Sequence, residues 1–374
     1  MKSLTRLFSL SLISFGYLSS AFGQQPALPP SFNLIHQCDV TEVKSQDRTG
    51  TCWSFSTSSY LESEILKLIG KEIDISEMFT VRNIYLEKAQ KYLRYQGTSQ
   101  FSQGSLAHDL LNSYEKDGLM PETAYPGKHP DSIHNHSKLV VEMKAYLDSL
   151  IGSGRIDADW KIKLSVILDA HLGPVPSKFS YEGKQYDARS FAKTVVPINL
   201  VDYVGITSFT HHPFYEEMVV EIPDNFSGGS YFNLPLDRLS EVANLALSNG
   251  YSIEWDGDVS EIGFSGRKGY AVFTDDTLTM KNNPLLCVEK TVNQGMRQDQ
   301  FDNYETTDDH LMHITGIVQI DDGRSFYLVK NSWGTKAGFD GYLLMSEAYF
   351  QMKTVSIYVN KNALTPEFRA LLEQ

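Results

Sequence analysis

The sequence predicts an α+β protein in which a helical N-terminal half precedes a strand-rich C-terminal half. Apolar residues recur at helical spacing over residues 54–68, which predicts a long buried helix. Two further helices are predicted over residues 77–95 and 106–116, each followed by a glycine that can end it. From Asp237 onward the pattern changes to short runs rich in β-branched and aromatic residues, as is typical of strands.

The middle of the chain is less regular. Helices are predicted over residues 137–150 and 159–172, and the stretch 195–222 is partly extended in character. The strands predicted in the C-terminal half cover residues 251–255, 269–273, 314–320 and 326–330.

Residues 1–23 have the composition of a secretory signal peptide. Lys2 and Arg6 precede an apolar run over residues 7–18, and small residues occupy the −3 and −1 positions of a cut after Gly23. The apolar run is too short for a stable membrane span. We therefore expect an exported protein, periplasmic or extracellular, whose mature chain begins at Gln24, with no membrane partner.

The charge balance bears on the class of partner. The 374 residues include 33 Lys and Arg against 46 Asp and Glu, a net charge of −13 at pH 7. Non-specific nucleic-acid binding depends on the neutralisation of phosphates by basic side chains, so no nucleic acid is expected as a partner. A chain of this length can bury a substantial core as one elaborated unit or as two domains.

The segment 43–56 has the pattern expected around a nucleophilic cysteine. Gly50 permits a tight turn before Cys52, and the run after it can begin a helix whose N-terminus favours a thiolate. Gln46 lies six residues earlier and can donate an amide N–H to a developing oxyanion. Such a donor contributes roughly 3 kcal/mol in comparable sites.

Partners for this cysteine occur near the C-terminus. His313 lies in the apolar, strand-like stretch 311–318, and Asn331 follows a second predicted strand, 327–330. Neighbouring strands would bring His313 and Asn331 side by side, facing Cys52. The imidazole would then take the thiol proton, and the asparagine oxygen would orient the ring. Each residue alone has an ordinary structural explanation, but their joint order favours catalysis.

Together these residues resemble the papain-like cysteine peptidases of the C1 family. Gln46, Cys52, His313 and the run Asn331-Ser332-Trp333-Gly334 follow that family's order of Gln, Cys, His and Asn. The closer resemblance is to the bleomycin hydrolase and aminopeptidase C branch. The segments that carry it are 49–53, 102–106, 110–121, 341–346, 359–362 and 371–374.

The resemblance implies a papain-like two-lobe fold within one peptidase domain, residues 24–374. A helical lobe would cover about residues 33–126, a helical insertion about 127–236, and an antiparallel, barrel-like β-lobe about 237–360. The active site would lie in the cleft between the lobes. In this branch the insertion forms a helical hook used in hexamer assembly, so a homo-oligomer is a further expectation.

The resemblance also assigns substrate-binding residues. Gly104 and Ser105 correspond to a Gly-Gly segment whose backbone pairs with an extended peptide, where small side chains permit close approach. Ser105 is also expected to be the N-cap of the following helix. Trp333 is expected to shield the His–Asn pair from water.

The implied function is a cysteine peptidase that hydrolyses peptide bonds through a thioacyl intermediate on Cys52, without cofactor or metal. In the branch a longer C-terminal tail places its carboxylate in the cleft, where it binds the free amine of the substrate. This sequence stops at Gln374, so an endopeptidase is the alternative to an aminopeptidase. The residues are also compatible with a catalytically silent peptide-binding protein or an acyltransferase, and the side-chain preference stays open.

The remaining cysteines and histidines give weak signals. Cys38 and Cys287 are expected to be separate buried residues, although an exported protein could join them in a disulfide. The spacing of Cys and His is not typical of a zinc site. His211 and His212 precede Pro213, and we interpret them as part of a loop turned by the proline rather than as metal ligands.

Overall fold

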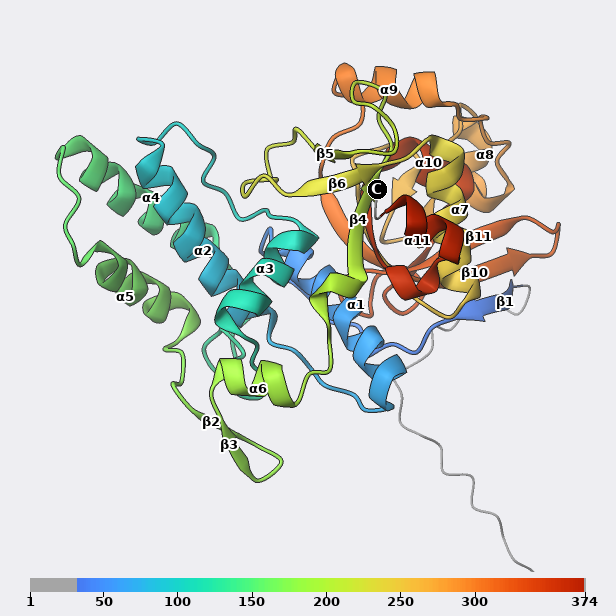
Figure 1. The fold of residues 1–374 in the computed structure, drawn as a ribbon. Helices are drawn as coiled ribbons and strands as arrows, with labels where there is room; N and C mark the ends of the chain where they lie inside the picture. The colour runs from blue at the N-terminus through green and yellow to red at the C-terminus, as the bar shows by residue number, and fades with distance from the viewer. Residues whose placement is uncertain (1–31, 373–374) are drawn as a thin grey trace, which may run out of the picture.

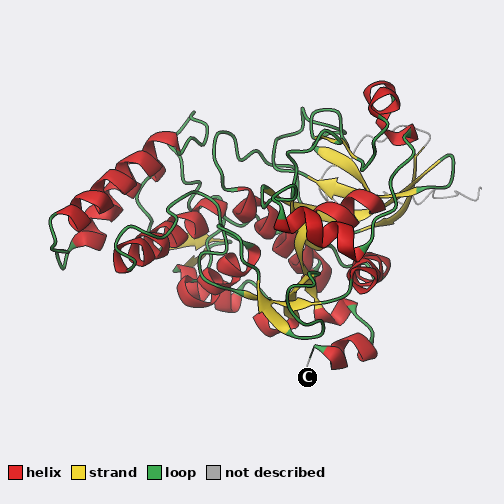
Figure 2. Cartoon of the chain, turned by 90° about the horizontal axis from the view of Figure 1, so that it is seen from above, coloured by secondary structure: helices red, strands yellow, loops and turns green. Residues whose placement is uncertain are grey.

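The computed structural model describes residues 32–372 and confirms the α+β class. Helices gather at one end of the molecule and a large sheet at the other, with the first helix between them (Figure 1). The same separation is visible from above (Figure 2). The predicted signal peptide, residues 1–23, lies outside the described residues, and export stays a prediction.

All five helices expected before residue 173 are present, with ends within three residues of the predicted ones. The helices of this half are α1 (Cys52–Ile69), α2 (Glu77–Arg94), α3 (Ala107–Asp117), α4 (Ser137–Gly152), α5 (Trp160–Leu172) and α6 (Ala188–Thr194). Helix α1 ends at Gly70, which has a positive φ of 63° and donates its N–H to Leu66. Such a left-handed C-terminal residue is the usual place for glycine. Between α5 and α6 lies a small hairpin of β2 (Phe179–Tyr181) and β3 (Lys184–Tyr186).

The large sheet contains eleven of the strands in the described chain, in the order β5-β6-β4-β13-β7-β10-β11-β12-β9-β8, with β1 paired to β10. Most pairs are antiparallel, as expected, but β4 with β6 and β9 with β12 are parallel. The strands are β1 (Phe32–Gln37), β4 (Tyr203–Thr207), β5 (Glu217–Val219), β6 (Ser230–Asn233), β7 (Ile253–Gly257), β8 (Phe264–Ser265), β9 (Tyr270–Ala271), β10 (His310–Ile320), β11 (Ser325–Lys330), β12 (Tyr342–Ser346) and β13 (Thr354–Asn360).

Further helices belong to the sheet end of the molecule. They are α7 (Leu236–Ser248), α8 (Thr277–Asn282), α9 (Gln294–Asp302), α10 (Glu347–Lys353) and α11 (Pro366–Leu371). One apolar core joins the sheet to α7, α10 and α11, and a second joins α1 to the other helices of the N-terminal half. Helix α1 packs against β10, so the helix that begins at Cys52 connects the two halves.

Two segments lie elsewhere than the sequence analysis placed them. Residues 203–233, assigned to the helical insertion, supply β4, β5 and β6 of the large sheet. The first strand, β1, was assigned to the helical lobe but pairs with β10. At this crossing a Cβ on Gly316 would lie 2.2 Å from the carbonyl oxygen of His36, so only glycine permits the approach. These pairings join segments that are far apart in the chain, and local sequence patterns carry no information about them.

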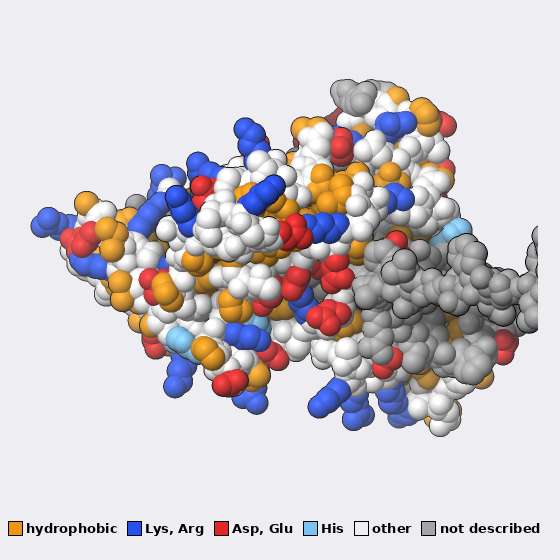
Figure 3. Space-filling view, turned by 90° about the horizontal axis from the view of Figure 1, so that it is seen from below, with side chains coloured by type: hydrophobic (Ala, Val, Ile, Leu, Met, Phe, Trp, Pro, Cys, Tyr) orange, Lys and Arg blue, Asp and Glu red, His pale blue; other side chains and the backbone are white. Residues whose placement is uncertain are grey.

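The surface agrees with the acidic composition. On the face shown in Figure 3, Asp and Glu side chains gather near the middle of the molecule. Within residues 32–372, no helix is both long and apolar enough to cross a lipid bilayer.

Glu254 on β7 is a buried carboxyl that makes stability depend on pH. It is 1% exposed, accepts a hydrogen bond from the Ser56 hydroxyl at 3.3 Å, and burial raises its pKa to about 8. An unfolded glutamate has a pKa of about 4.3. Between those values the folded chain holds a proton that the unfolded chain releases, so stability falls as pH rises through this window.

We therefore expect Glu254→Gln, which has no proton to lose, to show a smaller fall in Tm between about pH 5 and pH 8 than the wild type. Thermal unfolding at the two pH values measures this difference. Glu367→Gln is the matched control, because Glu367 is exposed on α11 and its replacement should leave the fall unchanged. An equal fall in all three proteins would contradict the prediction.

Candidate active site

Cys52 is the first residue of α1 and lies next to β10. Its side chain is buried, and its thiol is hydrogen-bonded by the backbone N–H groups of Leu311 and Trp53. Burial raises the pKa of the Cys52 thiol to about 12, the charges of Asp308 and Asp224 raise it further, and the two backbone groups oppose the shift. A thiol in this environment needs a nearby base to become a nucleophile.

The structure places His310, and not the predicted His313, beside Asn331. The Nε2 atom of His310 lies 2.8 Å from Oδ1 of Asn331. His310 also directly precedes Leu311, whose N–H reaches the Cys52 thiol. The predicted pairing of His313 with Asn331 is therefore wrong.

The alternation of side chains along β10 explains the correction. Successive residues of a strand point to opposite faces, so His310 and Met312 share one face while Leu311 and His313 share the other. In the β10–β11 register His313 pairs with Lys330, and one further step places Asn331 across from Met312. Asn331 thus shares a face with His310.

His313, also on β10, is a core histidine that contacts a later turn of α1. Its Nδ1 lies 2.9 Å from the Ser59 hydroxyl, and Ser59 is seven residues beyond Cys52, about 10 Å along a helix. Burial lowers the pKa of His313 well below its ordinary value, and the charge of Lys330 adds to the shift. Its environment is that of a neutral, buried ring at a distance from the thiol.

Asn331 and Trp333 hold the His310 ring. Asn331 Oδ1 is an acceptor, so His310 Nε2 carries the proton and Nδ1 is left as the basic nitrogen. The Trp333 ring lies 4.8 Å from that of His310, centroid to centroid, and covers it. Burial lowers the pKa of His310 to about 4, and the bond to Asn331 opposes the shift. A neutral imidazole covered from water can accept a thiol proton.

Gln46 is fixed by hydrogen bonds at both ends of its amide. Its Oε1 accepts from the Ser332 hydroxyl at 2.6 Å, and its Nε2 donates to the carbonyl of Thr49 at 2.7 Å. One N–H of the amide group remains beyond these bonds. The backbone N–H of Cys52 lies in the first turn of α1, where helices leave their donors without intrahelical partners. The Gln46 amide N–H and the Cys52 backbone N–H can therefore both donate to an oxyanion.

A cavity of about 470 Å³ opens beside Cys52. Gly104 and Ser105 line it, as does Gln103, whose side chain accepts from the Gly50 N–H at 2.7 Å. Ser105 is not the N-cap that the sequence predicted. Leu106 holds that position, and the Ser105 hydroxyl donates to Asp109 at 2.6 Å.

Several cavity residues were not predicted as site residues. Asp224, Asp308 and Asp309 line the same cavity as Cys52. The alternation of side chains indicates His310 only once the register of β10 with β11 is known, because the histidine and the asparagine must share a face. No local signal could have indicated Asp224, which lies between β5 and β6.

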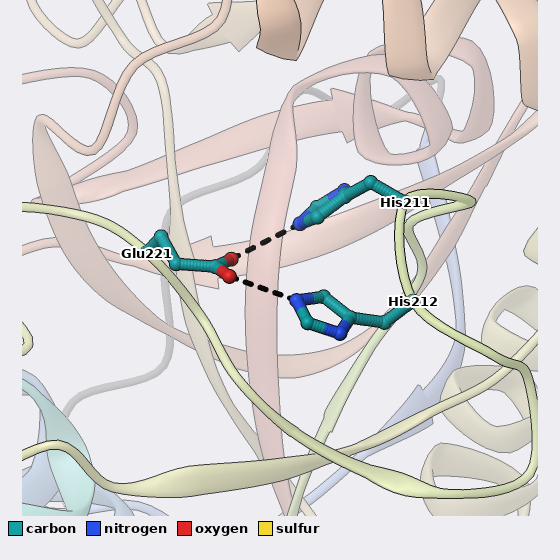
Figure 4. Close-up of side chains that lie close together, drawn as sticks. All are labelled: His211, His212 and Glu221. Atoms are coloured by element: carbon teal, nitrogen blue, oxygen red, sulfur yellow. Dashed lines mark hydrogen bonds and ion pairs between the residues drawn. The ribbon is translucent and has the colours of Figure 1, made fainter.

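The two remaining cysteines are buried and free, as the favoured interpretation expected. His211, His212 and Glu221 form a separate cluster whose possible ligand atoms lie within 4.8 Å of one another (Figure 4). The Nε2 atoms of His211 and His212 lie 3.0 and 2.8 Å from the carboxylate oxygens of Glu221.

A second contact tests whether this cluster fits a metal. Gln298 accepts from the Thr210 N–H at 2.6 Å, which directs its amide nitrogen to Nδ1 of His211 at 3.0 Å. The His211 Nδ1 is therefore an acceptor, and Nε2 carries the proton that points to Glu221. A metal ligand must present an unprotonated nitrogen, so the cluster fits hydrogen bonds between loops better than a metal ion.

Comparison with known proteins identifies the family. The Peptidase C1-like family model matches residues 177–374, and the papain family cysteine protease model matches residues 28–166. The chain belongs to the Peptidase C1-like family. It is thus a cysteine-type peptidase, as the sequence predicted.

Curated relatives of this peptidase cover most of its length. It is 25% identical to an aminopeptidase C from Streptococcus thermophilus, over 96% of this chain and 89% of the relative. It is 24% identical to an aminopeptidase C from Lactobacillus delbrueckii subsp. lactis, over 91% of this chain and 83% of the relative. The crystal structure of PepW from Lactobacillus rhamnosis HN001 shares its fold, with a TM-score of 0.70 at 22% identity, covering 91% and 84% of the two chains. The papain-like fold is confirmed.

Proposed function

We propose that the protein is a cysteine aminopeptidase in which Cys52 is the nucleophile and His310 is the base. This assignment rests on the contact between His310 and Asn331 at 2.8 Å. His310 directly precedes Leu311, whose backbone N–H reaches the Cys52 thiol. The names of the relatives, aminopeptidase C, support the exopeptidase class.

In the proposed mechanism His310 Nδ1 takes the proton of Cys52 as the sulfur attacks the carbonyl carbon of the substrate. The oxyanion that forms accepts hydrogen bonds from the Cys52 backbone N–H and the Gln46 amide. The imidazolium then gives its proton to the leaving amine, which leaves a thioester on Cys52. Water, deprotonated by His310, hydrolyses the thioester and restores the thiol. Asn331 keeps the ring in the required tautomer throughout.

A matched pair of substrates tests the exopeptidase class. Aminoacyl-aminomethylcoumarin with a free amine should be hydrolysed with a kcat/KM at least about tenfold above that of its N-acetyl form, since a charged group that loses its partner costs about 1.5–3 kcal/mol. Covalent trapping of Cys52 by E-64, followed by mass spectrometry, shows that the enzyme is active in the same sample. Equal rates on both substrates would support an endopeptidase, and no adduct would support a silent peptide-binding protein.

Two further expectations belong to this proposal. Export follows from the predicted leader, and assembly into a homo-oligomer is supported by exposed apolar residues on α4 and α5, namely Val141, Ile162 and Val166. The intact mass of the mature protein and its sedimentation coefficient check these two expectations.

A further inference from the structure

The cavity beside Cys52 is acidic on one side. Asp224, Asp308 and Asp309 all line it. The carboxylate of Asp309 is already hydrogen-bonded within the protein. It accepts from the backbone N–H groups of Val259 and Ser260 and from the Thr307 hydroxyl. Asp224 and Asp308 differ, since neither forms an ion pair within residues 32–372. The cleft therefore contains two carboxylates that no cation of the described residues contacts directly, although the charge of Lys88 acts on both.

Asp224 lies directly on the predicted substrate-binding backbone. A Cβ on Gly104 would lie 1.7 Å from Oδ2 of Asp224, so the carboxylate occupies the space above the glycine. The donors that reach Asp224, the Gln100 amide at 3.0 Å and the Ser102 hydroxyl at 3.3 Å, both contact Oδ1. They hold the carboxylate in place and leave Oδ2 for another donor.

Asp308 accepts a hydrogen bond from a second carboxyl group, that of Asp256. Asp256 on β7 is 1% exposed, hydrogen-bonds to Asp308, and has a pKa that burial raises well above its ordinary value. Neither Asp256 Oδ1 nor Asp308 Oδ2 has a donor from any other described residue. The hydrogen bond from Asp256 lowers the pKa of Asp308, while burial and the charge of Asp224 raise it to about 7. Asp308 is therefore the more acidic carboxyl of this pair.

The cation nearest to this cavity is already engaged. Lys88 is buried, and its Nζ donates to the carbonyl of Gly104 and, at 3.4 Å, to the Ser102 hydroxyl. Its charge also acts on Asp224 and Asp308. Two carboxylates beside one ammonium leave room for one further positive charge in the cavity.

We propose that the side-chain carboxylates of Asp224 and Asp308 form the subsite that binds the protonated amino terminus of the substrate. The proposal rests on the aminopeptidase function proposed above and names the residues that enforce it. Both carboxylates share the cavity with the nucleophile, and their negative charges disfavour a thiolate there. A bound ammonium neutralises these charges. A substrate with a free amine therefore removes their contribution to the raised pKa of the Cys52 thiol, and a blocked substrate does not.

The test compares Asp224→Asn and Asp308→Asn with the wild type on the matched free and N-acetyl substrates. We expect each variant to lower the ratio of kcat/KM for the free over the blocked substrate by about tenfold to a hundredfold, the usual effect of removing a charge-assisted bond. Asp237→Asn is the control. It removes the same charge from an exposed position on α7, and the ratio should stay at the wild-type value.

The outcomes separate the two proposals. If the wild type shows no preference for the free amine, the aminopeptidase function fails. If the wild type shows the preference and both variants retain it, the function stands and the subsite is overturned. E-64 labelling of Cys52 in each variant identifies folded, active enzyme, and because the readout is a ratio within one protein, a partial loss of folded material does not affect it.

Discussion

Replacement of His310 by alanine is expected to lower kcat/KM by about 10³-fold or more, because the Cys52 thiol then has no base. Burial holds the pKa of this thiol at about 12, so little thiolate forms without the imidazole. Alkylation of Cys52 by E-64 should fall in parallel. Steady-state kinetics and adduct mass spectrometry measure the two effects.

His313→Ala is the matched control, because it removes the same side chain from β10 beside Ser59, about 10 Å along α1 from Cys52. In this variant the Ser59 hydroxyl and Lys330 lose a buried neighbour. A buried polar group that loses its partner costs about 1–3 kcal/mol of stability, so Tm should fall. The folded fraction should still be labelled by E-64. An inactive His313→Ala that is fully folded, beside an active His310→Ala, would make His313 the base after all.

Gln46→Ala is expected to lower kcat by about 10² to 10³-fold with a smaller change in KM, the pattern for loss of one oxyanion donor. The donor acts on charge that develops only in the transition state, so substrate binding is less affected. Gln319→Ala serves as the control at the far end of β10, where the side chain donates to the carbonyl of Gly323.

Gln46→Glu separates the chemical from the structural role of this residue. A glutamate can still accept from the Ser332 hydroxyl, as Gln46 does at 2.6 Å, but it offers no N–H and adds negative charge beside the oxyanion. Its kcat should fall at least as far as that of Gln46→Ala. Retention of wild-type kcat by either variant would remove Gln46 from the proposed mechanism.

Local patterns in the sequence were sufficient to place Cys52 at the start of a helix and to predict the helices of the first half. Cys52 follows a turn and begins α1 because the residues around it set the local backbone, and the apolar spacing of residues 54–68 reports the buried helix behind it. Short motifs also predicted that Gln46 and Asn331 lie near each other, and in the structure Gln46 accepts from Ser332, the residue after Asn331. These features depend on residues close together in the chain.

Tertiary structure alone decided which histidine serves the site, which carboxylates line it, and which strands build the sheet. His310 and His313 lie three residues apart on one strand, so the alternation of faces and the register with β11 determine which one meets Asn331. Asp224 reaches Gly104 across 120 residues of sequence because β5 and β6 join the large sheet rather than the helical insertion. The pairing of β4 with β6 and β13 joins segments that are far apart in the chain, and the register of β10 with β11 depends on their turn and on the packing of both strands together.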